Sequence, residues 1–423
     1  MALVLGLLFS CAAGASFSGS FRSSTDYYPE HLGEQTDDLV PYLVLDLNGK
    51  HRLRKNLRFQ WRLYGLANLE SESEPEQYYG DISEGFLEWK LSDLRWRLGV
   101  NTLNWGIVDV SSPMDVVNTP AFFHPTRIHK QGAPMVELDW KPERLGVHGI
   151  YIPKQRRAEL PSTDSRWLPR SFLTNPGNAE GTVVLPDFIE YRFGEPETLS
   201  KALDNNWGIR LTSNLGSFDF ALMHFEGAAP SPKVRPTIVA DAGSTPTEVV
   251  ARSSIDLQVV SYRVRTSGFG FAWAGDNLIV RVESAYQHTI SEDPLLQPWS
   301  WGNVLALETN VAFGEHTATV LAQYYYTENP QAPDNQISSS YRLFDRTGLI
   351  GARVPWSEEL LITGSVLYES RTQGVFWMLG FENKLSDVLR WGIAYRDLSA
   401  SRDGLLKTYD KNDHAVLDLT YFF

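Results

Sequence analysis

Along much of the chain, apolar and polar residues alternate with a period of two, and this pattern constrains the fold more than any other feature. Successive side chains of a β-strand point to opposite faces, so each alternating segment predicts a strand with one apolar and one polar face. The clearest examples are NLRFQWRLYG (56–65), NLIVRVESAYQ (277–287), TATVLAQYYYT (317–327), LLITGSVLY (360–368) and VLRWGIAYRD (388–397). The chain is therefore predicted to be all-β.

Such strands fit either a soluble β-sandwich, with the apolar face in a core, or a membrane β-barrel, with the apolar face in lipid. Two features favour the barrel. The apolar faces often end in Tyr or Trp, as lipid-facing bands do, and aromatic residues make up 12% of the chain. The polar faces carry long charged side chains, for which a water-filled lumen has room. The charged side chains predicted to face the lumen are Arg58, Arg62, Glu88, Arg95, Arg97, Glu137, Asp139, Arg281, Glu283, Arg390 and Arg396.

Short polar turns and longer irregular segments separate the predicted strands. Eight short turns join strands in pairs, and a first strand near 16–27 and a last strand at 413–423 complete the set. Short periplasmic turns at one rim and long extracellular loops at the other are typical of outer-membrane barrels. We therefore expect an antiparallel transmembrane β-barrel of about 18 strands over 16–423, with both termini at the short-turn rim. A count of 16 remains an alternative, because the first strand and the strand at 145–152 are weakly patterned.

The N-terminus has the features of a secretory signal peptide. A short apolar run is followed by Ala13-Gly14-Ala15, which fits an A-x-A cleavage site, so residues 1–15 are predicted to be removed. Cys11 is the only cysteine in the chain and would leave with them. The mature protein would then have no thiol nucleophile and no cysteine-bound metal. Outside this region there is no run of 18 apolar residues, which excludes transmembrane helices.

The chain ends on an alternating segment, HAVLDLTYFF (414–423). Its apolar face carries Leu417, Leu419, Tyr421 and Phe423. This ending resembles the C-terminal assembly signal of Gram-negative outer-membrane proteins, in which apolar residues precede a last aromatic residue at every second position. The resemblance implies that periplasmic chaperones and the barrel-assembly machinery are partners, and that the protein resides in the lipid of the bacterial outer membrane.

The segment 96–140 does not show the alternating pattern of barrel strands throughout. It resembles a proteobacterial family of porin-like outer-membrane barrels, related in character to porins and to exporters of alginate type. The matching residues are Arg97-Leu98-Gly99, Trp105-Gly106, Asp109 and Pro113-Met114-Asp115. The sequence departs from the family pattern at Asn101, where Gln is commoner, and at Ile107, where an acidic residue is commoner. The resemblance implies a channel-like barrel and does not specify a substrate.

Within this segment, local signals predict one or two helical turns at about 113–118. Ser112 is a good N-cap, Pro113 suits the first helical position, and Pro120 ends the turn. In general porins, the loop at the corresponding place folds inward and narrows the pore. We therefore expect 106–134 to form a constriction with opposed charges, or else a packed loop whose charges pair with one another and with the rim. The charges concerned are Asp109, Asp115, Arg127, His129 and Lys130.

The sequence nominates no catalytic or metal site. None of its nine His lies in a motif such as G-x-S-x-G or H-E-x-x-H, and His124 and His129 are weakly spaced as a metal pair. No cofactor is implied. The formal net charge of −13 and the lack of a basic stripe argue against nucleic acid as a partner. The predicted lumen charges alternate in sign between neighbouring strands, which fits cross-strand ion pairs that support the wall as well as contacts to a solute.

The expected function is an outer-membrane, porin-like channel for the passive passage of small solutes, without enzymatic activity. Alternatives within transport are a path for hydrophobic compounds or for an exported polymer. Alternatives from other classes are an outer-membrane hydrolase and a surface barrel whose long loop at 153–203 binds a ligand.

Overall fold

A computed structural model describes residues 15–31, 38–72, 75–124, 126–170, 182–184, 189–242, 248–294, 296–329, 346–402 and 405–423. Residues 1–14 of the predicted signal peptide lie outside the described residues. Ala15, its last residue, is the first residue of the first strand.

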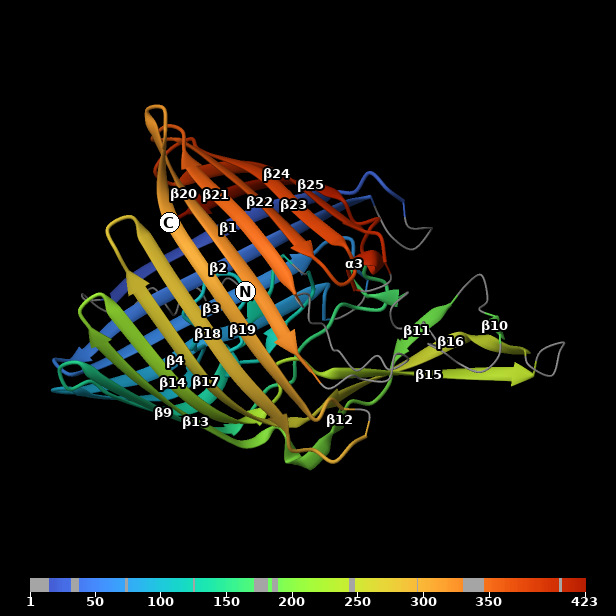
Figure 1. Ribbon diagram of the computed structural model, residues 1–423, viewed down its shortest axis with the longest axis horizontal. Helices are drawn as coiled ribbons and strands as arrows, with labels where there is room; N and C mark the ends of the chain where they lie inside the picture. Colours follow the sequence, from blue (N-terminus) through green and yellow to red (C-terminus); the bar gives the residue numbers. More distant parts are fainter. Residues whose placement is uncertain are drawn as a thin grey trace.

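The protein is a closed barrel of 18 antiparallel strands, which confirms the larger of the two expected counts (Figure 1). Each strand pairs with its neighbours in chain order, and the last pairs with the first. The barrel strands are β1 (Ala15–Tyr27), β2 (Leu39–Arg54), β3 (Leu57–Asn68), β4 (Tyr78–Leu91), β5 (Leu94–Asn101), β8 (Ala133–Trp140), β9 (Leu145–Lys154), β13 (Asp204–Leu215), β14 (Phe218–Ala228), β17 (Arg263–Ala274), β18 (Leu278–Thr289), β19 (Trp299–Phe313), β20 (His316–Glu328), β21 (Thr347–Pro355), β22 (Leu360–Glu369), β23 (Gly374–Lys384), β24 (Leu389–Ala400) and β25 (His414–Phe422).

The first and last strands form the seam of the barrel. Beyond the end of β25, Phe423 donates its backbone N–H to Gly19 at 3.0 Å and accepts one from Gly19 at 2.9 Å. The rings of Phe17 and Phe423 lie 5.6 Å apart. Closure leaves no unpaired strand edge, which is a requirement for any sheet that spans a membrane.

The two ends of the barrel differ, as the sequence predicts. Eight hairpins turn within two to four residues at one end, for example at 55–56 and 314–315, and both β1 and β25 have their terminal ends there. The long connections lie at the other end and include 102–132, 155–203 and 229–262. Shorter connections at this end include 28–38, 69–77 and 370–373.

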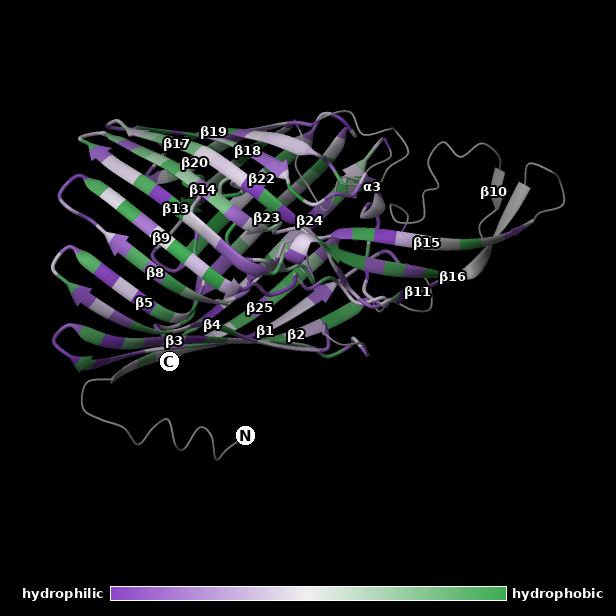
Figure 2. Ribbon diagram, turned by 90° about the horizontal axis from the view of Figure 1, so that it is seen from below, coloured by the Kyte–Doolittle hydropathy of each residue, from purple (hydrophilic) through white to green (hydrophobic). Residues whose placement is uncertain are grey.

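Apolar side chains lie on the outside of the wall. Figure 2 shows the alternation as stripes of hydrophobic and hydrophilic residues along the strands. Leu222, Tyr286 and Val366 are exposed, whereas their neighbours Met223 and Ala285 are buried on the inner side. The four residues of the predicted C-terminal signal, Leu417, Leu419, Tyr421 and Phe423, are also exposed on this outer face. An apolar outer band around a polar interior is the surface arrangement that a lipid bilayer requires.

A β-bulge in β4 changes which side chains point inward along that strand. Arg62 of β3 pairs with Glu84, but the next residue, Leu63, pairs with Ile82, so Ser83 is extra. As a result, Asp81 and Ser83 point inward and are buried on the side of the bulge toward the long connections. On the side toward the short turns, Glu84 and Glu88 point inward. The bulge brings two more polar side chains to the interior near the long connections.

Smaller elements lie inside the barrel and beyond its long-loop end. A hairpin of β15 (Lys233–Ala242) and β16 (Glu248–Ser261) extends away from the barrel, and three short strands pair with β16 (Figure 1). Among the described residues, no helix is long and apolar enough to cross a membrane. The remaining elements are β6 (Pro120–Ala121), β7 (His129–Lys130), β10 (Thr182–Val184), β11 (Glu190–Phe193), β12 (Glu197–Thr198), η1 (Leu199–Lys201) and α3 (Leu405–Thr408).

Candidate functional site: a segment folded inside the barrel

The connection between β5 and β8, residues 102–132, lies against the inner face of the wall, and we call it the inner segment. Its course is marked by glycines at inward positions of the wall strands. A Cβ on Gly208 of β13 would lie 2.7 Å from the ring of Trp105, and one on Gly268 of β17 would lie 2.8 Å from Met114. A Cβ on Gly302 of β19 would lie 3.0 Å from Pro113. These positions accept the inner segment because they carry no side chain.

Apolar packing buries the first half of the inner segment. Trp105, Met114 and Val117 join one apolar cluster with inward residues of the wall such as Met135 and Phe225. Val108 packs farther around the barrel, against β19 and β20. The segment is therefore fixed to the wall over several strands.

The carboxylate of Glu283 on β18 holds the turn at 107–112. It accepts hydrogen bonds from the backbone N–H groups of Ile107 and Val108, the latter at 3.0 Å, and from the hydroxyl of Ser112. The same turn is also tied to β20, because Ser111 N–H donates to the hydroxyl of Tyr325 at 2.9 Å. Backbone donors that a loop would otherwise leave unpaired inside the barrel are thus satisfied by the wall.

The expected helical turns at 113–118 do not form, and this prediction is wrong. The N-cap contact is present, since Met114 N–H donates to the Ser112 hydroxyl at 3.1 Å. One turn follows, with Asp115 N–H donating to Ser112 C=O at 3.3 Å, but no helix continues. Val116 and Val117 have low helix propensity and are buried against the wall instead, so tertiary packing outweighs the cap.

Side-chain amides hold the second half of the inner segment. Asn118 accepts a hydrogen bond from Leu103 N–H at 2.8 Å and donates to the carbonyl of Gln131 at 2.8 Å, which closes the segment into a loop. Gln155, just after β9, donates to the carbonyl of Val117 at 2.6 Å. The side chains of Asn118 and Gln155, which make these bonds, are both buried, so the loop has one well-defined shape.

Three of the five predicted constriction charges lie close to the lumen. Lys130 donates to Asp115 at 2.5 and 2.7 Å and to the carbonyl of Leu103 at 2.9 Å. Asp109 lies 3.2 Å from Arg281 of β18. The structure therefore brings Asp115 and Lys130 together as a pair and places Asp109 against the wall.

Arg127 and His129 differ from the expectation, because both bind the wall. The side chain of Arg127 is only 11% exposed, and its guanidinium pairs with Asp26 at 2.5 Å. His129 lies 2.8 Å from Asp81 and stacks on Tyr64 with ring centroids 3.9 Å apart. These two residues therefore anchor the inner segment. They match the alternative in which the loop charges pair with the rim.

The predicted lumen charges of the first strands form an ion-pair ladder across the inner wall. Glu88 of β4 lies 2.8 Å from Arg58 of β3 and 3.0 Å from Arg97 of β5. Arg97 reaches Glu137 of β8 at 2.9 Å. Such cross-strand pairs stabilise neighbouring strands. Other predicted lumen charges also pair across neighbouring strands, as Arg95–Glu88, Arg62–Asp46, Arg281–Glu308 and Arg390–Glu382. Asp139 pairs with Lys141 of the following turn, and Arg396 contacts His414.

A second connection, residues 155–170, also folds inward. Trp167 is buried against Tyr28, Tyr409 and His124, and its indole N–H donates to the hydroxyl of Tyr28 at 3.2 Å. The carboxylate of Glu76 accepts hydrogen bonds from the backbone N–H and the hydroxyl of Ser162, at 3.1 and 3.0 Å. The long-loop end of the lumen is thus partly filled from two directions.

A cavity of about 440 Å³ remains between these inner segments and the wall of β18 to β20. Val110, Asp115 and Ile128 line it from the inner segment, and Gln287 and Ser300 line it from the wall. Nearer the short turns, a second cavity of about 370 Å³ is lined by residues such as Ile107 and Arg210. The larger cavity is the candidate functional site, because it lies in the lumen where the inner segment narrows the interior.

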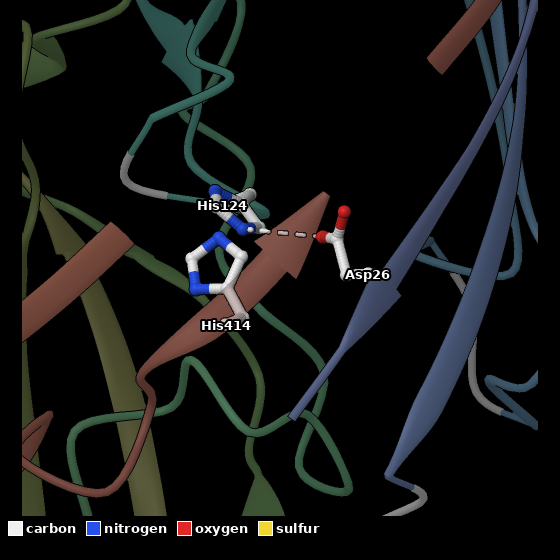
Figure 3. A group of neighbouring side chains, drawn as sticks. All are labelled: Asp26, His124 and His414. Atoms are coloured by element: carbon white, nitrogen blue, oxygen red, sulfur yellow. Dashed lines mark ion pairs between the residues drawn. The ribbon is translucent and has the colours of Figure 1, made fainter. Parts of the chain in front are cut away.

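Asp26, His124 and His414 form a buried group beside the larger site, and they come from β1, the inner segment and β25 (Figure 3). The nearest atoms of Asp26 and His124 are 3.6 Å apart. His124 Nδ1 accepts the backbone N–H of Thr126 at 3.1 Å, so the proton of the neutral ring is on Nε2, which faces Asp26. Burial lowers the pKa of His124 well below its usual range, so the ring is neutral.

This group suits structural support better than cation binding. The ring nitrogen of His124 that faces the other two residues carries a proton, so it has no lone pair for a metal. Arg127 contacts Asp26 and Arg396 contacts His414, and both positive charges oppose a divalent cation. The group joins the seam of the barrel to the inner segment.

Asp81, Ser83 and His129 resemble a hydrolase triad in composition but not in geometry. Ser83 Oγ and Asp81 Oδ2 both contact the same ring nitrogen, Nε2 of His129, at 3.3 and 2.8 Å. A triad needs the nucleophile and the carboxylate on opposite nitrogens of the imidazole. The arrangement therefore offers no proton relay, and Asp81 is further occupied by Arg156.

Comparison with known proteins supports the fold. No family model matches the chain, and no curated protein matches it. Among solved structures, Acinetobacter baumannii OccAB3 is similar over 97% of this chain and 100% of that chain, with a TM-score of 0.52 and 8% sequence identity. Salmonella typhi OmpF in complex with daunomycin is similar over 97% of both chains, with a TM-score of 0.46 and 10% identity. At this identity, the likeness to OccAB3 shows the barrel fold alone.

The sequence analysis did not identify the wall glycines that contact the inner segment, and it did not identify Glu283 as the residue that holds its first turn. Gly208, Gly268 and Gly302 stand at polar-face positions of alternating segments, where a side chain would be expected. Glycine inside a strand often marks the close approach of another backbone or side chain. That signal could have located the course of the inner segment. Nothing local to Glu283 distinguishes it from the other predicted lumen charges.

Proposed function

We propose that the protein is a porin-like channel of the bacterial outer membrane, through which small solutes pass by diffusion. The observation that carries this proposal is the closed barrel with an apolar outer surface and a lumen narrowed by an anchored inner segment, with a cavity of about 440 Å³ left beside it. Binding sites of small molecules are typically about 300–1,000 Å³.

The measurement that tests this function is ion conductance. Protein refolded in detergent and added to planar lipid bilayers is expected to give discrete current steps. The control is protein carrying Tyr421→Ser and Phe423→Ser, which loses the outer aromatic end of β25. Absence of current steps from correctly folded wild-type protein would refute the channel.

The outer membrane is the proposed location, with its lipid, the periplasmic chaperones and the barrel-assembly machinery as partners. The exposed residues Leu417, Leu419, Tyr421 and Phe423 support this, because they present the alternating C-terminal pattern on the lipid-facing side. We propose no nucleic acid partner, no cofactor and no catalytic activity. Passage of hydrophobic compounds is the second candidate within transport, because apolar side chains of the inner segment line the cavity.

A further inference from the structure

The larger cavity combines exposed apolar side chains with neutral polar groups. Val110 and Ile128 of the inner segment are 47% and 49% exposed, although both point into the interior of the barrel. Apolar surface left in water is unfavourable by about 25 cal/mol per Å². A solute with an apolar face would cover this surface on entering the cavity and would gain that free energy.

Aromatic rings extend the apolar side of the cavity. Phe122 lines it from the inner segment, backed by the buried rings of Trp167 from the second inward connection and Tyr409 from the connection before β25. The three rings come from segments far apart in sequence, so the barrel and both inward connections must be assembled before this surface exists. Aromatic faces and edges pack well against the rings of a solute.

The wall on the other side supplies hydrogen-bonding groups without charge. Gln287, Ser300 and Thr327 line the cavity from β18, β19 and β20. Amides and hydroxyls both donate and accept, so they can replace the water around the hydroxyl groups of a solute.

The charges of the cavity are already paired. Of the 24 described residues that line it, Asp115 and Lys130 are the two that carry charge, and they bind each other at 2.5 and 2.7 Å. A carboxylate on the solute would have to compete with Asp115 for Lys130, and an ammonium group would have to compete with Lys130 for Asp115. A charged solute would therefore lose its hydration without gaining a free partner.

We propose that this cavity is a binding subsite for uncharged solutes that combine an aromatic or similarly apolar ring with hydroxyl groups. The inference rests on the proposed channel function and specifies the class of solute that the channel favours. The ring lies against Val110, Ile128 and the aromatic side, while the hydroxyl groups face Gln287, Ser300 and Thr327.

The test uses two matched probes and a current measurement. Phenyl β-D-glucopyranoside is uncharged and carries both a ring and hydroxyl groups, and phenyl β-D-glucuronide has the same size but adds a carboxylate. Each is added to single channels in planar bilayers at both voltage polarities, and the dissociation constant is taken from transient current interruptions. We expect the glucoside to bind at least about tenfold more tightly than the glucuronide. D-glucose, which has no aromatic ring, is expected to bind far more weakly.

A double variant tests the location of the site. Val110→Thr with Ile128→Thr keeps the approximate shape but removes apolar surface from the cavity, and we expect it to weaken glucoside binding about tenfold. Val239→Thr is the matched control, because Val239 is 44% exposed on β15, outside the cavity. Equal binding of both probes, or an unchanged dissociation constant in the double variant, would overturn the proposal.

The outcome separates this inference from the channel function. If ions pass but the probes are not distinguished, the channel stands and the subsite is wrong. If no ions pass, calorimetric titration of the glucoside into the folded protein in detergent still measures binding, and absence of heat from binding overturns the subsite as well.

Discussion

A single carboxylate positions the narrow part of the lumen. Glu283 binds Ile107, Val108 and Ser112, which lie about 170 residues earlier in the chain. Hydrogen bonds to a buried charged group contribute more than neutral ones, about 1.5–3 kcal/mol each. A single substitution should therefore destabilise the inner segment most where one wall side chain makes hydrogen bonds to several of its groups.

Replacing Glu283 by Ala is expected to loosen the inner segment while the wall remains folded. Two backbone N–H groups and one hydroxyl lose their acceptor, which destabilises the docked segment by about 3 kcal/mol or more. Limited proteolysis should then cut within 106–114, and single-channel current should become noisier. The control is Glu382→Ala, which removes an exposed ion pair with Arg390 and should change stability by at most about 1 kcal/mol. Equal protease resistance of E283A and wild type would contradict the anchoring role.

His124 is expected to make the folded protein sensitive to acid. Burial and the nearby charges of Arg127 and Arg396 lower its pKa below that of the unfolded chain, so the unfolded state binds the proton more readily. Stability is therefore full above about pH 6.5 and falls by about 1.4 kcal/mol per pH unit below it, until the folded pKa is reached. His124→Asn keeps an acceptor for Thr126 N–H but cannot be protonated. Denaturant unfolding at pH 7.5 and pH 5.0 should show a smaller loss in the variant, and an equal loss in both proteins would refute this role of His124.

At the scale of elements, the strands and the inner segment follow different rules. A strand is specified by its own alternation, and its outward side chains need only be apolar. The inner segment has no regular pattern of its own, and its shape comes from contacts with many wall strands, among them β1, β4, β13, β17 and β18. Changes to strands should therefore act on membrane insertion, and changes to the inner segment should act on passage.

Arg in place of Val282 tests the orientation of β18. Val282 pairs with Phe271 and Leu305 on the outward face, so a charge there would sit in lipid. The expected cost is about 2–4 kcal/mol if the position lies near the bilayer midplane. Gln287→Lys is the control, since Gln287 faces the cavity and a charge there stays in water. Unfolding in lipid vesicles measures both, and equal tolerance of the two variants would show that the faces are assigned wrongly.

Removing the inner segment tests its effect on the size of the pore. Replacement of 111–130 by a short Gly-Ser linker is expected to raise single-channel conductance severalfold, because a barrel of 18 strands has a wide interior when nothing fills it. Loss of Arg127 leaves Asp26 unpaired, so Asp26→Asn should be introduced with the deletion. A folded variant with unchanged conductance would mean that the narrowest point lies elsewhere.

At the scale of the whole molecule, barrel closure connects the two ends of the chain. β1 and β25 pair over eight residues, and the buried group of Asp26, His124 and His414 joins this seam to the inner segment. The inner segment can therefore reach its final position only in the closed barrel. Assembly of the wall and formation of the cavity are coupled through this seam.

Removal of Phe423, or replacement of Tyr421 and Phe423 by Ser, is expected to leave the protein in the periplasm. The last strand then loses the aromatic end that contacts Phe17 and that resembles an assembly signal. Cell fractionation and heat-modifiable migration in gels provide the measurement. A matched control is Asp418→Asn with Thr420→Ser, which changes the inner face of the same strand. Normal insertion of the Phe423 variant would show that this ending is dispensable.

The sequence by itself determined the wall of this protein. Period-two alternation is a local property, because the pleat sends neighbouring side chains to opposite faces whatever lies beyond them. It therefore predicted the all-β barrel, the 18 strands, the two unlike ends and the outward face of Leu417 to Phe423. It also singled out 106–134 as a departure from the wall.

Only the tertiary structure decided what lies inside that wall. No helix forms at 113–118, because Val116 and Val117 are buried against the wall instead. Arg127 does not face the lumen but pairs with Asp26, which lies about 100 residues earlier in the sequence. These outcomes depend on which strands stand opposite each other once the barrel has closed. Local sequence patterns carry no information about which residues far apart in the sequence come into contact. The side chains of an irregular segment are directed by the long-range contacts that bury them and satisfy their hydrogen bonds.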